Sequence, residues 1–579
     1  MGFLVSPGVE VKEVDLTDII PAQSTSIGGF AGYFRWGPIG ELVTVSSEKD
    51  LARIFGAPST ENATLERSFL QAAGFLKYSN NLKVSRANAT GSLNAYSSFA
   101  DDSPAGEYTI STVNDLETNQ SALNTAGVHI VARYAGALGN SLKVHVVNAD
   151  NYSDQPSTVQ SVLQFTPATT EWAENLTGGT AVNDEVSIVV VDEDGEFTGV
   201  KGEILEVHEG LSIGRNAKNQ FGESNYWADF VNTNSSLIFG VKDTDPITGD
   251  PEITASSTDL GAISWLGDDS PGATYLSLGG GQDATSFDSS TVSTALDLFE
   301  DSETVDVNLL FAYEDGDNVV DSRLKTIVDT RRDCVGFISA PISVKDQTSD
   351  ASKKSTVTTK FDAIGSSSYL VFDSTPAYVY NKYRDAYAWV SLSGHIAGLC
   401  ASTDDVADPW FSPAGLNRGQ LQGIVRLAYN PKQADRDELY QKRINPVLTL
   451  PGQGTVLFGD KTALTKPSAF DRINVRRLFI TIEKAIATAS KFQLFELNDT
   501  FTRSTFRNAI EPFLRDVQGR RGITDFRVVC DESNNTAEVI DGNRFVADIY
   551  IKPTRSINFV TLNFVATRTG TAFEELVGR

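Results

Sequence analysis

Side chains suited to acid–base or nucleophilic chemistry are few in this sequence. It contains four histidines, His129, His145, His208 and His395, and the first three lie in a strongly acidic stretch. A serine hydrolase needs a histidine base beside its nucleophile, and His395 is the only candidate for that base. No H-E-x-x-H or P-loop pattern is present in the sequence. We therefore interpret His395 as a hydrogen-bonded packing residue and expect neither an enzyme nor a cofactor.

Residues that could bind a metal ion are poorly arranged for that purpose. The segment Asp192-Glu193-Asp194-Gly195-Glu196 is as acidic as a calcium loop, but its spacing does not match the EF-hand pattern. A solvated hairpin turn is the better interpretation. The three cysteines, Cys334, Cys400 and Cys530, are far apart and odd in number. This argues against a disulfide framework and a metal cluster, and favours small buried apolar residues.

Basic side chains gather in the last hundred residues, at Arg503, Arg507, Arg515, Arg520 and Arg521. Sites for single-stranded nucleic acid combine basic residues with stacking aromatic residues, and we do not expect such a site here. A basic face that meets an acidic protein partner fits the pattern better.

The net charge of −27 is concentrated in the middle of the chain. Residues 96–300 contain 31 acidic and 6 basic side chains, whereas residues 471–579 contain 14 and 16. Such a field keeps a surface hydrated and repels nucleic acid. We expect residues 96–300 to face outward and the nearly neutral ends to pack. We also expect no secretory signal and no membrane insertion, because no apolar run approaches about 18 residues.

The length of 579 residues predicts several domains, of which the first contains residues 21–95. Its pattern predicts a strand within 24–35, helices at 47–56 and 65–78, and a strand at 82–86. Residues 96–300 are rich in Ser, Thr, Asn, Asp and Gly, and predict one or two mainly-β outer insertions with long loops. The expected strands there are 129–134, 142–147, 186–192 and 204–209.

Residues 301–470 show a β-α-β rhythm, with nearly continuous apolar strands. This pattern predicts a mostly parallel sheet covered by helices on both faces. The strands are expected at 305–313, 334–339 and 367–372, and the helices at 318–331 and 355–365. Residues 385–400, rich in small side chains, predict a further helix, and 444–450 and 454–458 predict two strands.

Residues 471–579 predict an α+β domain. A helix at 471–497 has an apolar stripe that includes Leu478, Ile482, Ala485, Ala489 and Phe492. A second helix should begin at an N-cap, Asn498 or Asp499, and strands should follow at 523–530, 545–551 and 557–565. The last strand is apolar on both faces, so it is expected to be buried or to pair with another chain.

Several long segments resemble the tail sheath proteins of contractile-tailed bacteriophages, in the style of T4-like myoviruses including cyanophages. The resemblance covers about the first 90 residues and everything after about 300. The segments include SPGVEVKEVD (6–15), LSLGGGQD (276–283), DPWFSPAGLNRG (408–419), NPVLTLPGQGTVLFGDKT (445–462) and IKPTRSINFVTLNFVATRTG (551–570).

The resemblance implies a structural subunit that forms stacked hexameric rings around a tail tube and contracts to drive the tube through the host envelope. It implies a multidomain α/β and α+β fold with a subtilisin-like α/β core and extended terminal arms, one at 1–20 and one at the C-terminus. Arms of neighbouring subunits would add strands to a small sheet in a third. The residues expected to do so are Val9, Val11, Val14, Phe559, Leu562, Phe564 and Phe573.

The expected partners are further copies of the chain in a helical homo-oligomer, the tail tube protein, and the baseplate and tail terminator proteins. Arg503, Arg507 and Arg515 are expected to face the tube. The protein would reside in the virion tail and, during assembly, in the host cytoplasm. The sequence leaves open a sheath of a related contractile injection system or tailocin, and disfavours a subtilisin-like hydrolase because no triad motif is present.

Overall fold

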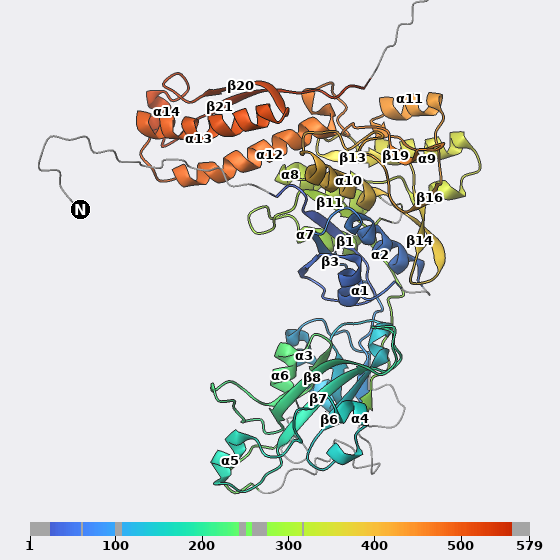
Figure 1. Ribbon diagram of the computed structural model, residues 1–579, viewed down its shortest axis with the longest axis vertical. Coiled ribbons are helices and arrows are strands. Elements are labelled where there is room, and N and C mark those ends of the chain that lie inside the picture. The colour runs from blue at the N-terminus through green and yellow to red at the C-terminus, as the bar shows by residue number, and fades with distance from the viewer. Residues whose placement is uncertain are drawn as a thin grey trace, which may run out of the picture. The chain divides into compact units, whose positions relative to one another are not determined.

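The computed structural model describes residues 24–58, 62–98, 107–242, 251–257, 275–314, 316 and 318–558. These residues form two compact units (Figure 1). The larger unit contains 24–407 and 413–471, and the smaller contains 408–412 together with the chain from 472 onward. The fold is a mixed α/β architecture with several separate sheets.

A seven-stranded sheet organises the larger unit, in the order β17-β13-β12-β11-β1-β3-β2. Its strands pair in parallel except β2, which is antiparallel to β3 and forms one edge. The mostly parallel sheet predicted from the apolar strands is thereby confirmed. The strands are β1 (Gly28–Gly32), β2 (Leu42–Val45), β3 (Leu82–Arg86), β11 (Leu309–Ala312), β12 (Val335–Ile338), β13 (Leu370–Asp373) and β17 (Ile444–Asn445).

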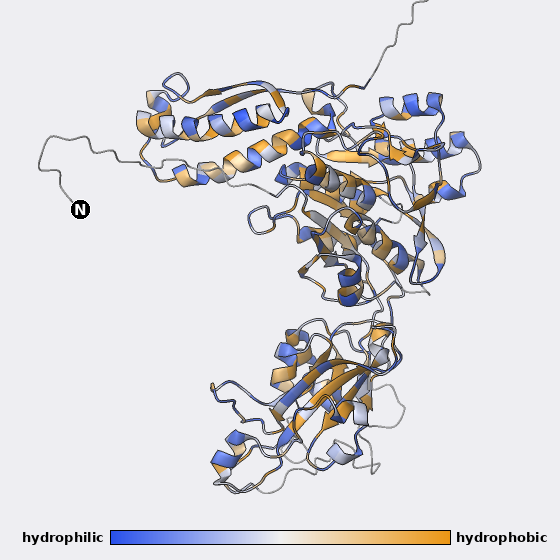
Figure 2. Ribbon diagram, in the orientation of Figure 1, coloured by the Kyte–Doolittle hydropathy of each residue, from blue (hydrophilic) through white to orange (hydrophobic). Residues whose placement is uncertain are grey.

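Helices cover both faces of this sheet, as expected for a parallel sheet. Helices α2 (Ala63–Leu76) and α10 (Ser393–Val406) pack on one face, and α7 (Ser289–Asp297) and α8 (Val319–Arg331) contact the strands as well. Adjacent residues of a strand point to opposite faces of the sheet. Two adjacent glycines of β1 therefore show that the pair α2 and α10 and the pair α7 and α8 lie on opposite faces. A Cβ atom on Gly28 would lie 2.5 Å from Phe75 of α2, whereas one on Gly29 would lie 2.9 Å from Phe299 after α7. The strands between the helices are hydrophobic (Figure 2).

The helix predicted at 385–400 is wrong in its first part. Residues Ala386–Val390 form strand β15, which pairs with β14 (Ala377–Asn381), and α10 begins only at Ser393. The side chains of β15 alternate between the inner face, with Ala388 and Val390, and the outer face, with Tyr387 and Trp389. This period of two is the signature of a strand. Strand β16 (Ile424–Leu427) completes a three-stranded antiparallel sheet.

The acidic stretch enters and leaves the core through paired segments. Thr90 and Ser286 exchange two backbone hydrogen bonds of 3.2 Å, and Leu93 pairs likewise with Gln282. Beyond this point lie two antiparallel sheets, β10-β6-β7-β8 and β4-β5-β9. We call the stretch between Thr90 and Ser286 the insertion. Its strands are β4 (Tyr96–Ser98), β5 (Val128–Ala132), β6 (Leu142–Val147), β7 (Glu185–Asp192), β8 (Glu203–Ser212), β9 (Ile238–Gly240) and β10 (Tyr275–Ser277).

The insertion also contains helices, α3 (Val113–Thr125), α4 (Ser157–Gln160), α5 (Glu171–Thr177) and α6 (Trp227–Asn234). The chain has returned to the core by α7, which contacts β1 and α8. Trp36, from the core, is 2% exposed and lies in the hydrophobic core of the insertion. Its indole ring packs edge-on against Tyr134 and Phe197. The insertion therefore shares part of its core with the sequence that precedes it.

A buried arginine ties the insertion to the core. The Arg86 guanidinium donates hydrogen bonds to the carbonyl oxygens of Phe34 (3.1 Å), Gly37 (2.7 Å) and Ala135 (2.8 Å). Burial lowers the pKa of Arg86 to about 10, so the side chain stays charged at neutral pH. Buried charges are tolerated when hydrogen bonds satisfy them, and three carbonyls do so here.

The remaining elements of the larger unit lie around the seven-stranded sheet and agree with the predicted β-α-β rhythm. Helix α1 begins after the N-cap Ser47, whose side chain accepts a hydrogen bond from the Asp50 N–H. The strand predicted at 444–450 divides into β17, which joins the seven-stranded sheet, and β18, which forms a hairpin with β19. The bounds are α1 (Glu48–Phe55), α9 (Asp350–Ile364), α11 (Gln433–Gln441), β18 (Val447–Leu450) and β19 (Gly454–Leu457).

The smaller unit consists of helices α12 (Ile473–Ser490), α13 (Thr500–Gly519) and α14 (Ala537–Asp541) with strands β20 (Ile523–Val529) and β21 (Asp548–Pro553). The Asp499 side chain accepts a hydrogen bond from the Thr502 N–H and so caps α13. Asp499 is one of the two N-caps predicted from the sequence. Leu478 and Ile482 of α12 pack with Ile510 and Leu514 of α13 in one core. In the described part of the chain, no helix is both long and apolar enough to cross a membrane.

A short segment from between α10 and β16 completes the core of the smaller unit. Trp410 lies in that core, and its indole N–H donates to the carbonyl oxygen of Arg520 at 3.0 Å. The Asp408 carboxylate accepts from the Arg520 guanidinium at 2.8 Å. Within residues 24–558, the chain therefore passes between the two units after residues 407, 412 and 471.

Candidate assembly surface

Strands β20 and β21 form a two-stranded antiparallel sheet in the smaller unit, with Val529 opposite Asp548 and Ile523 opposite Pro553. The side chains alternate, so one face is apolar and packs on the helices. That face includes Phe526, Val528, Ile549 and Ile551, with Phe545 and Ala547 just before β21. The outer face is polar and includes the ion pair between Lys552 and Asp525 at 2.9 Å.

Both outer edges of this sheet can accept a further strand. Within residues 472–558, β20 and β21 are the only strands, and each pairs only with the other. Two strands alone are marginally stable, and packing against a helix supports them, here α13. Unpaired strand edges form templates for pairing with another chain. The sheet is therefore the candidate site for added strands.

The residues predicted to add those strands lie outside the described part of the chain. They are Val9, Val11, Val14, Phe559, Leu562, Phe564 and Phe573. The described chain continues from β21 to Asn558, and the side chain of Ile557 near this end is 85% exposed. Strand exchange through these residues remains a prediction.

The three arginines predicted to face a tail tube occupy different environments on α13. Arg503 is only 6% exposed, and its guanidinium donates to the Asn498 side-chain oxygen at 3.0 Å. Arg507 and Arg515 are exposed and flank Glu511, at 3.9 Å and 3.6 Å. The burial of Arg503 leaves little of its side chain for a partner, so the exposed basic residues of this helix face are Arg507 and Arg515.

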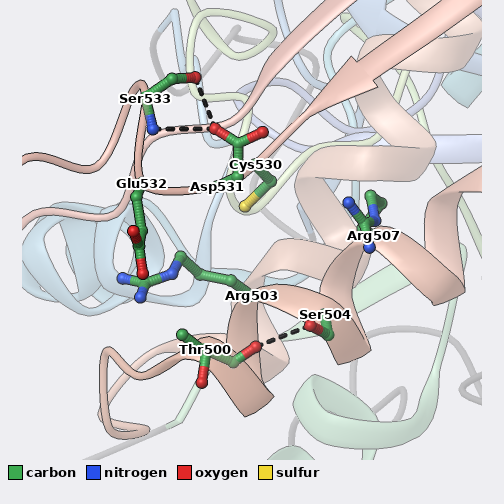
Figure 3. A pocket seen from close by; sticks show the side chains of 8 residues that line it. All are labelled: Thr500, Arg503, Ser504, Arg507, Cys530, Asp531, Glu532 and Ser533. Carbon is green, nitrogen blue, oxygen red and sulfur yellow. Dashed lines mark hydrogen bonds between the residues drawn. The ribbon is translucent and has the colours of Figure 1, made fainter.

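A pocket of about 390 Å³ lies between the first turns of α13 and the loop after β20 (Figure 3). The charges of its two arginines and two acidic residues balance. The Asp531 carboxylate already accepts hydrogen bonds from the backbone N–H and the hydroxyl of Ser533. Burial raises the pKa of the Cys530 thiol, which makes it a poor nucleophile. The lining residues are Thr500, Arg503, Ser504, Arg507, Cys530, Asp531, Glu532 and Ser533.

His395 packs inside the larger unit, as the sequence indicated. It is 1% exposed, and its Nδ1 lies 3.4 Å from the hydroxyl of Tyr78. A Cβ atom on Gly74 would lie 2.8 Å from the imidazole ring, so α2 and α10 approach closely here. Burial lowers the pKa of His395 to about 3, far below the range that suits a general base near neutral pH.

The acidic segment after β7 is a hairpin turn, also as predicted. The buried Asp192 carboxylate accepts hydrogen bonds from the backbone N–H groups of Gly195 (3.0 Å), Phe197 (3.0 Å) and Thr198 (2.8 Å). Those bonds hold the turn without an ion. Cys334, Cys400 and Cys530 are buried and unpaired by disulfides. Among the described residues, no group of three or more His, Cys, Asp or Glu side chains could hold a metal ion.

A group of exposed apolar side chains follows α12 and extends into the first turn of α13, and it was not expected from the sequence. Phe492 was predicted to belong to the buried stripe of a helix reaching 497, and this is wrong because α12 ends at Ser490. We call residues 491–501 the apolar turn. Its large exposed side chains are Phe492 (71%), Leu494 (64%), Phe495 (105%), Leu497 (77%) and Phe501 (69%).

Comparisons with known proteins agree over the whole chain. The model of the phage tail sheath protein central domain matches residues 288–463, and the model of the phage tail sheath C-terminal domain matches 465–567. The tail sheath protein of Vibrio phage KVP40 is 34% identical over 99% of this chain and 100% of its own. The tail sheath protein of Enterobacteria phage T4 is 33% identical over 99% of both chains.

A solved structure supports the fold. The sheath tail protein from Listeria innocua aligns with a TM-score of 0.53 at 12% identity, covering 93% of this chain and 97% of that one. The two relatives exceed 30% identity over nearly their full length, and the two family models together match most of the residues after 288. This chain belongs to the family of phage tail sheath proteins.

Proposed function

We propose that this protein is the structural subunit of a contractile tail sheath. Copies polymerise as stacked hexameric rings around a tail tube, and contraction of the sheath drives the tube through the host envelope. The observation that carries the proposal is the full-length similarity to the tail sheath proteins of KVP40 and T4. The role is structural rather than enzymatic, in keeping with those relatives and with the burial of His395.

The two-stranded sheet of the smaller unit is where copies connect. Residues 1–20 of one neighbour and the C-terminal arm of another add strands to its two edges. Strand addition uses main-chain hydrogen bonds for affinity and alternate side chains for register. The open edges of β20 and β21 support this assignment, as do the alternating Val9, Val11 and Val14 in the sequence.

The parts of the chain divide the remaining work. Residues 21–95 and 301–470 form a core of subtilisin-like type, whose parallel sheet supports that description. The stretch between Thr90 and Ser286 forms the acidic outer insertion, and it ends before the predicted boundary at 300 because α7 packs on the core strands β1 and β3. Residues 471–579 face the tail tube, where Arg507 and Arg515 supply positive charge. Baseplate and tail terminator proteins bind the two ends of the polymer in the virion tail, after assembly in the host cytoplasm.

Truncation tests the strand-addition step. Purified full-length protein should form tubes visible by negative-stain microscopy. Deleting residues 1–20, or the chain from Ser556 onward, should leave a soluble protein with an unchanged circular dichroism spectrum that forms no tubes. A control variant, Val200→Ser at the exposed tip of the β7–β8 hairpin, should assemble normally. Normal tubes from either truncation would disprove the role of the arms.

A further inference from the structure

Arg503 on α13 is a buried charge that the described residues leave without an ionic partner. Its side chain is 6% exposed, and its guanidinium donates to the neutral side-chain oxygen of Asn498 at 3.0 Å. A guanidinium has five N–H donors, and no carboxylate in the described part of the chain forms an ion pair with this one. Buried charges in proteins are normally paired with an opposite charge. Arg503 therefore has donors available for an anion.

The pocket in Figure 3 gives a ligand access to these donors. Arg503 is too buried to meet a broad partner surface, but it lines the pocket, as does Arg507. Arg507 approaches the carboxylate of Glu511 only to 3.9 Å. Asp531 accepts hydrogen bonds within its own turn, and the exposed Glu532 forms no ion pair with either arginine. Because guanidinium groups recognise carboxylates through charge-assisted hydrogen bonds, the pocket suits an acidic side chain.

The pocket lies where the two-stranded sheet ends. Arg503 precedes Phe506 and Ile510 on the stripe of α13 that packs against the sheet. Strand β20 ends at Val529, and the next residue, Cys530, lines the pocket. In a strand added beside β20, the side chains on the inner face would contact the apolar part of this stripe. The inner-face side chain at the end of β20 would meet Arg503 instead.

The sequence of residues 1–20 has side chains in the order that this surface requires. Alternate residues of an extended strand share a face, so Val9, Val11 and Glu13 would fall together. Two apolar side chains would therefore be followed, on the same face, by a carboxylate. Residues 1–20 contain four acidic side chains and one basic side chain, whereas residues 559–579 contain two of each. Charge complementarity therefore favours the N-terminal segment over the C-terminal one.

We propose that the pocket binds the Glu13 carboxylate of a neighbouring copy and that Arg503 thereby fixes the register of the added strand. This inference rests on the proposed function, because it requires copies joined through residues 1–20. A shift of the strand by two residues keeps the same set of side chains on the inner face, so the apolar residues alone do not define the register. Such a shift would place Val11 against Arg503 or bury Glu13 among apolar side chains. Both arrangements leave a buried charge unpaired, which is strongly destabilising.

Assembly of full-length variants tests the role of Glu13. The protein concentration needed for tube formation is measured by sedimentation and checked by negative-stain microscopy. Glu13→Lys should raise it at least about tenfold, because a buried charge loses its partner and meets a like charge. Glu10→Lys makes the same change of charge on the other face of the strand. It should raise the concentration by less than about twofold, because exposed charges contribute little.

Exchange of the two charges identifies Arg503 as the partner. Arg503→Glu alone should impair tube formation, and its combination with Glu13→Arg should restore it. Arg515 lies outside the pocket, so Arg515→Glu should not rescue Glu13→Arg. Circular dichroism and calorimetry of the unassembled protein check that Arg503→Glu folds. If it does not fold, Arg503→Met removes the charge without adding another. In that background, Glu13→Gln should raise the concentration needed for tube formation no further, because the two residues act as one pair.

The outcomes distinguish this inference from the function on which it rests. If full-length protein forms no polymer, the proposed sheath function fails. If it forms tubes, but Glu13→Lys assembles like the parent or is impaired no more than Glu10→Lys, the pocket inference is overturned. Rescue of Arg503→Glu by Glu574→Arg or Glu575→Arg, but not by Glu13→Arg, would assign the pocket to the C-terminal arm and would overturn it as well.

Discussion

Asp373 provides a pH-dependent test of the core. It ends β13, is 1% exposed, and accepts hydrogen bonds from the Ser339 hydroxyl and from the backbone N–H groups of Ala340 and Thr375. Burial nevertheless raises the pKa of its carboxyl to about 7, from an ordinary value of 3.8. Nearby, Lys360 forms ion pairs with Glu314 and Asp321, and burial also raises the pKa of Glu314.

The sign of the effect follows from proton binding. Between pH 4 and 7 the folded protein holds a proton on Asp373 that the unfolded chain has lost, so stability falls as pH rises through this window. Below pH 4 the carboxyl is protonated in both states, and above pH 7 it is ionised in both. Outside this window, Asp373 therefore does not change the free energy of unfolding with pH. At about 1.4 kcal/mol per pH unit, the shift of about three units corresponds to about 4 kcal/mol as an upper value.

The substitution Asp373→Asn isolates this contribution. An amide can accept the two backbone hydrogen bonds and donate to Ser339, as the protonated acid does, and it cannot ionise. We expect the stability advantage of the variant over the parent to be about 3 kcal/mol larger at pH 8 than at pH 5, because the parent loses stability between these two pH values. For a cooperative unit of more than 400 residues, this is an increase of about 3 °C in the unfolding midpoint.

Differential scanning calorimetry of unassembled protein at pH 5 and pH 8 measures this difference. Asp194→Asn, at an exposed position, serves as the control and should leave the pH dependence of the midpoint unchanged. The unfolding midpoints of Asp373→Asn and the parent could instead differ by the same amount at pH 5 and pH 8. Asp373 would then be ionised in the folded protein at both pH values, and the reasoning would be wrong.

Three further predictions concern assembly and the link between core and insertion. Replacing residues 91–285 by a short glycine turn, together with Trp36→Ser to remove an exposed indole, should leave tube formation intact by electron microscopy; loss of tubes would place the insertion in the packing. Arg86→Met should lower stability by about 3–5 kcal/mol because three buried carbonyl oxygens lose their donor, and an unchanged calorimetric midpoint would contradict this. Reversing Arg507 and Arg515 to Glu should weaken co-sedimentation with tail tubes, and the loss should be larger at low salt. Reversing Arg53, the exposed arginine of α1, should not weaken it.

Local patterns were sufficient for the elements of the core. The strands at 309–312, 335–338 and 370–373 are short apolar runs between helices, and such runs predict buried parallel strands. The caps of α1 and α13 were identifiable because Ser and Asp at those positions accept backbone hydrogen bonds. These features depend on residues close together in the sequence.

Features that depend on distant residues could not be predicted in this way. β10 pairs with β6 across more than a hundred residues, and no local pattern specifies that partner. The pattern at 385–400 was dominated by small residues of α10, which concealed the two-residue period of β15. The burial of Arg503 and the exposure of Phe492 depend on where the helices end and what packs beside them, and helix ends are the least certain part of a sequence-based prediction.

The crossings between the two units have a mechanical consequence. A single linker would carry the whole of any pulling force between the units, whereas in the described part of the chain the connections after residues 407, 412 and 471 share it in parallel. The middle segment is held by Trp410, whose indole is buried in the smaller unit and hydrogen-bonded to Arg520. Pulling on that segment must extract an aromatic side chain from a packed core before the backbone extends. Such a connection resists stretching between the two units more than a free linker would.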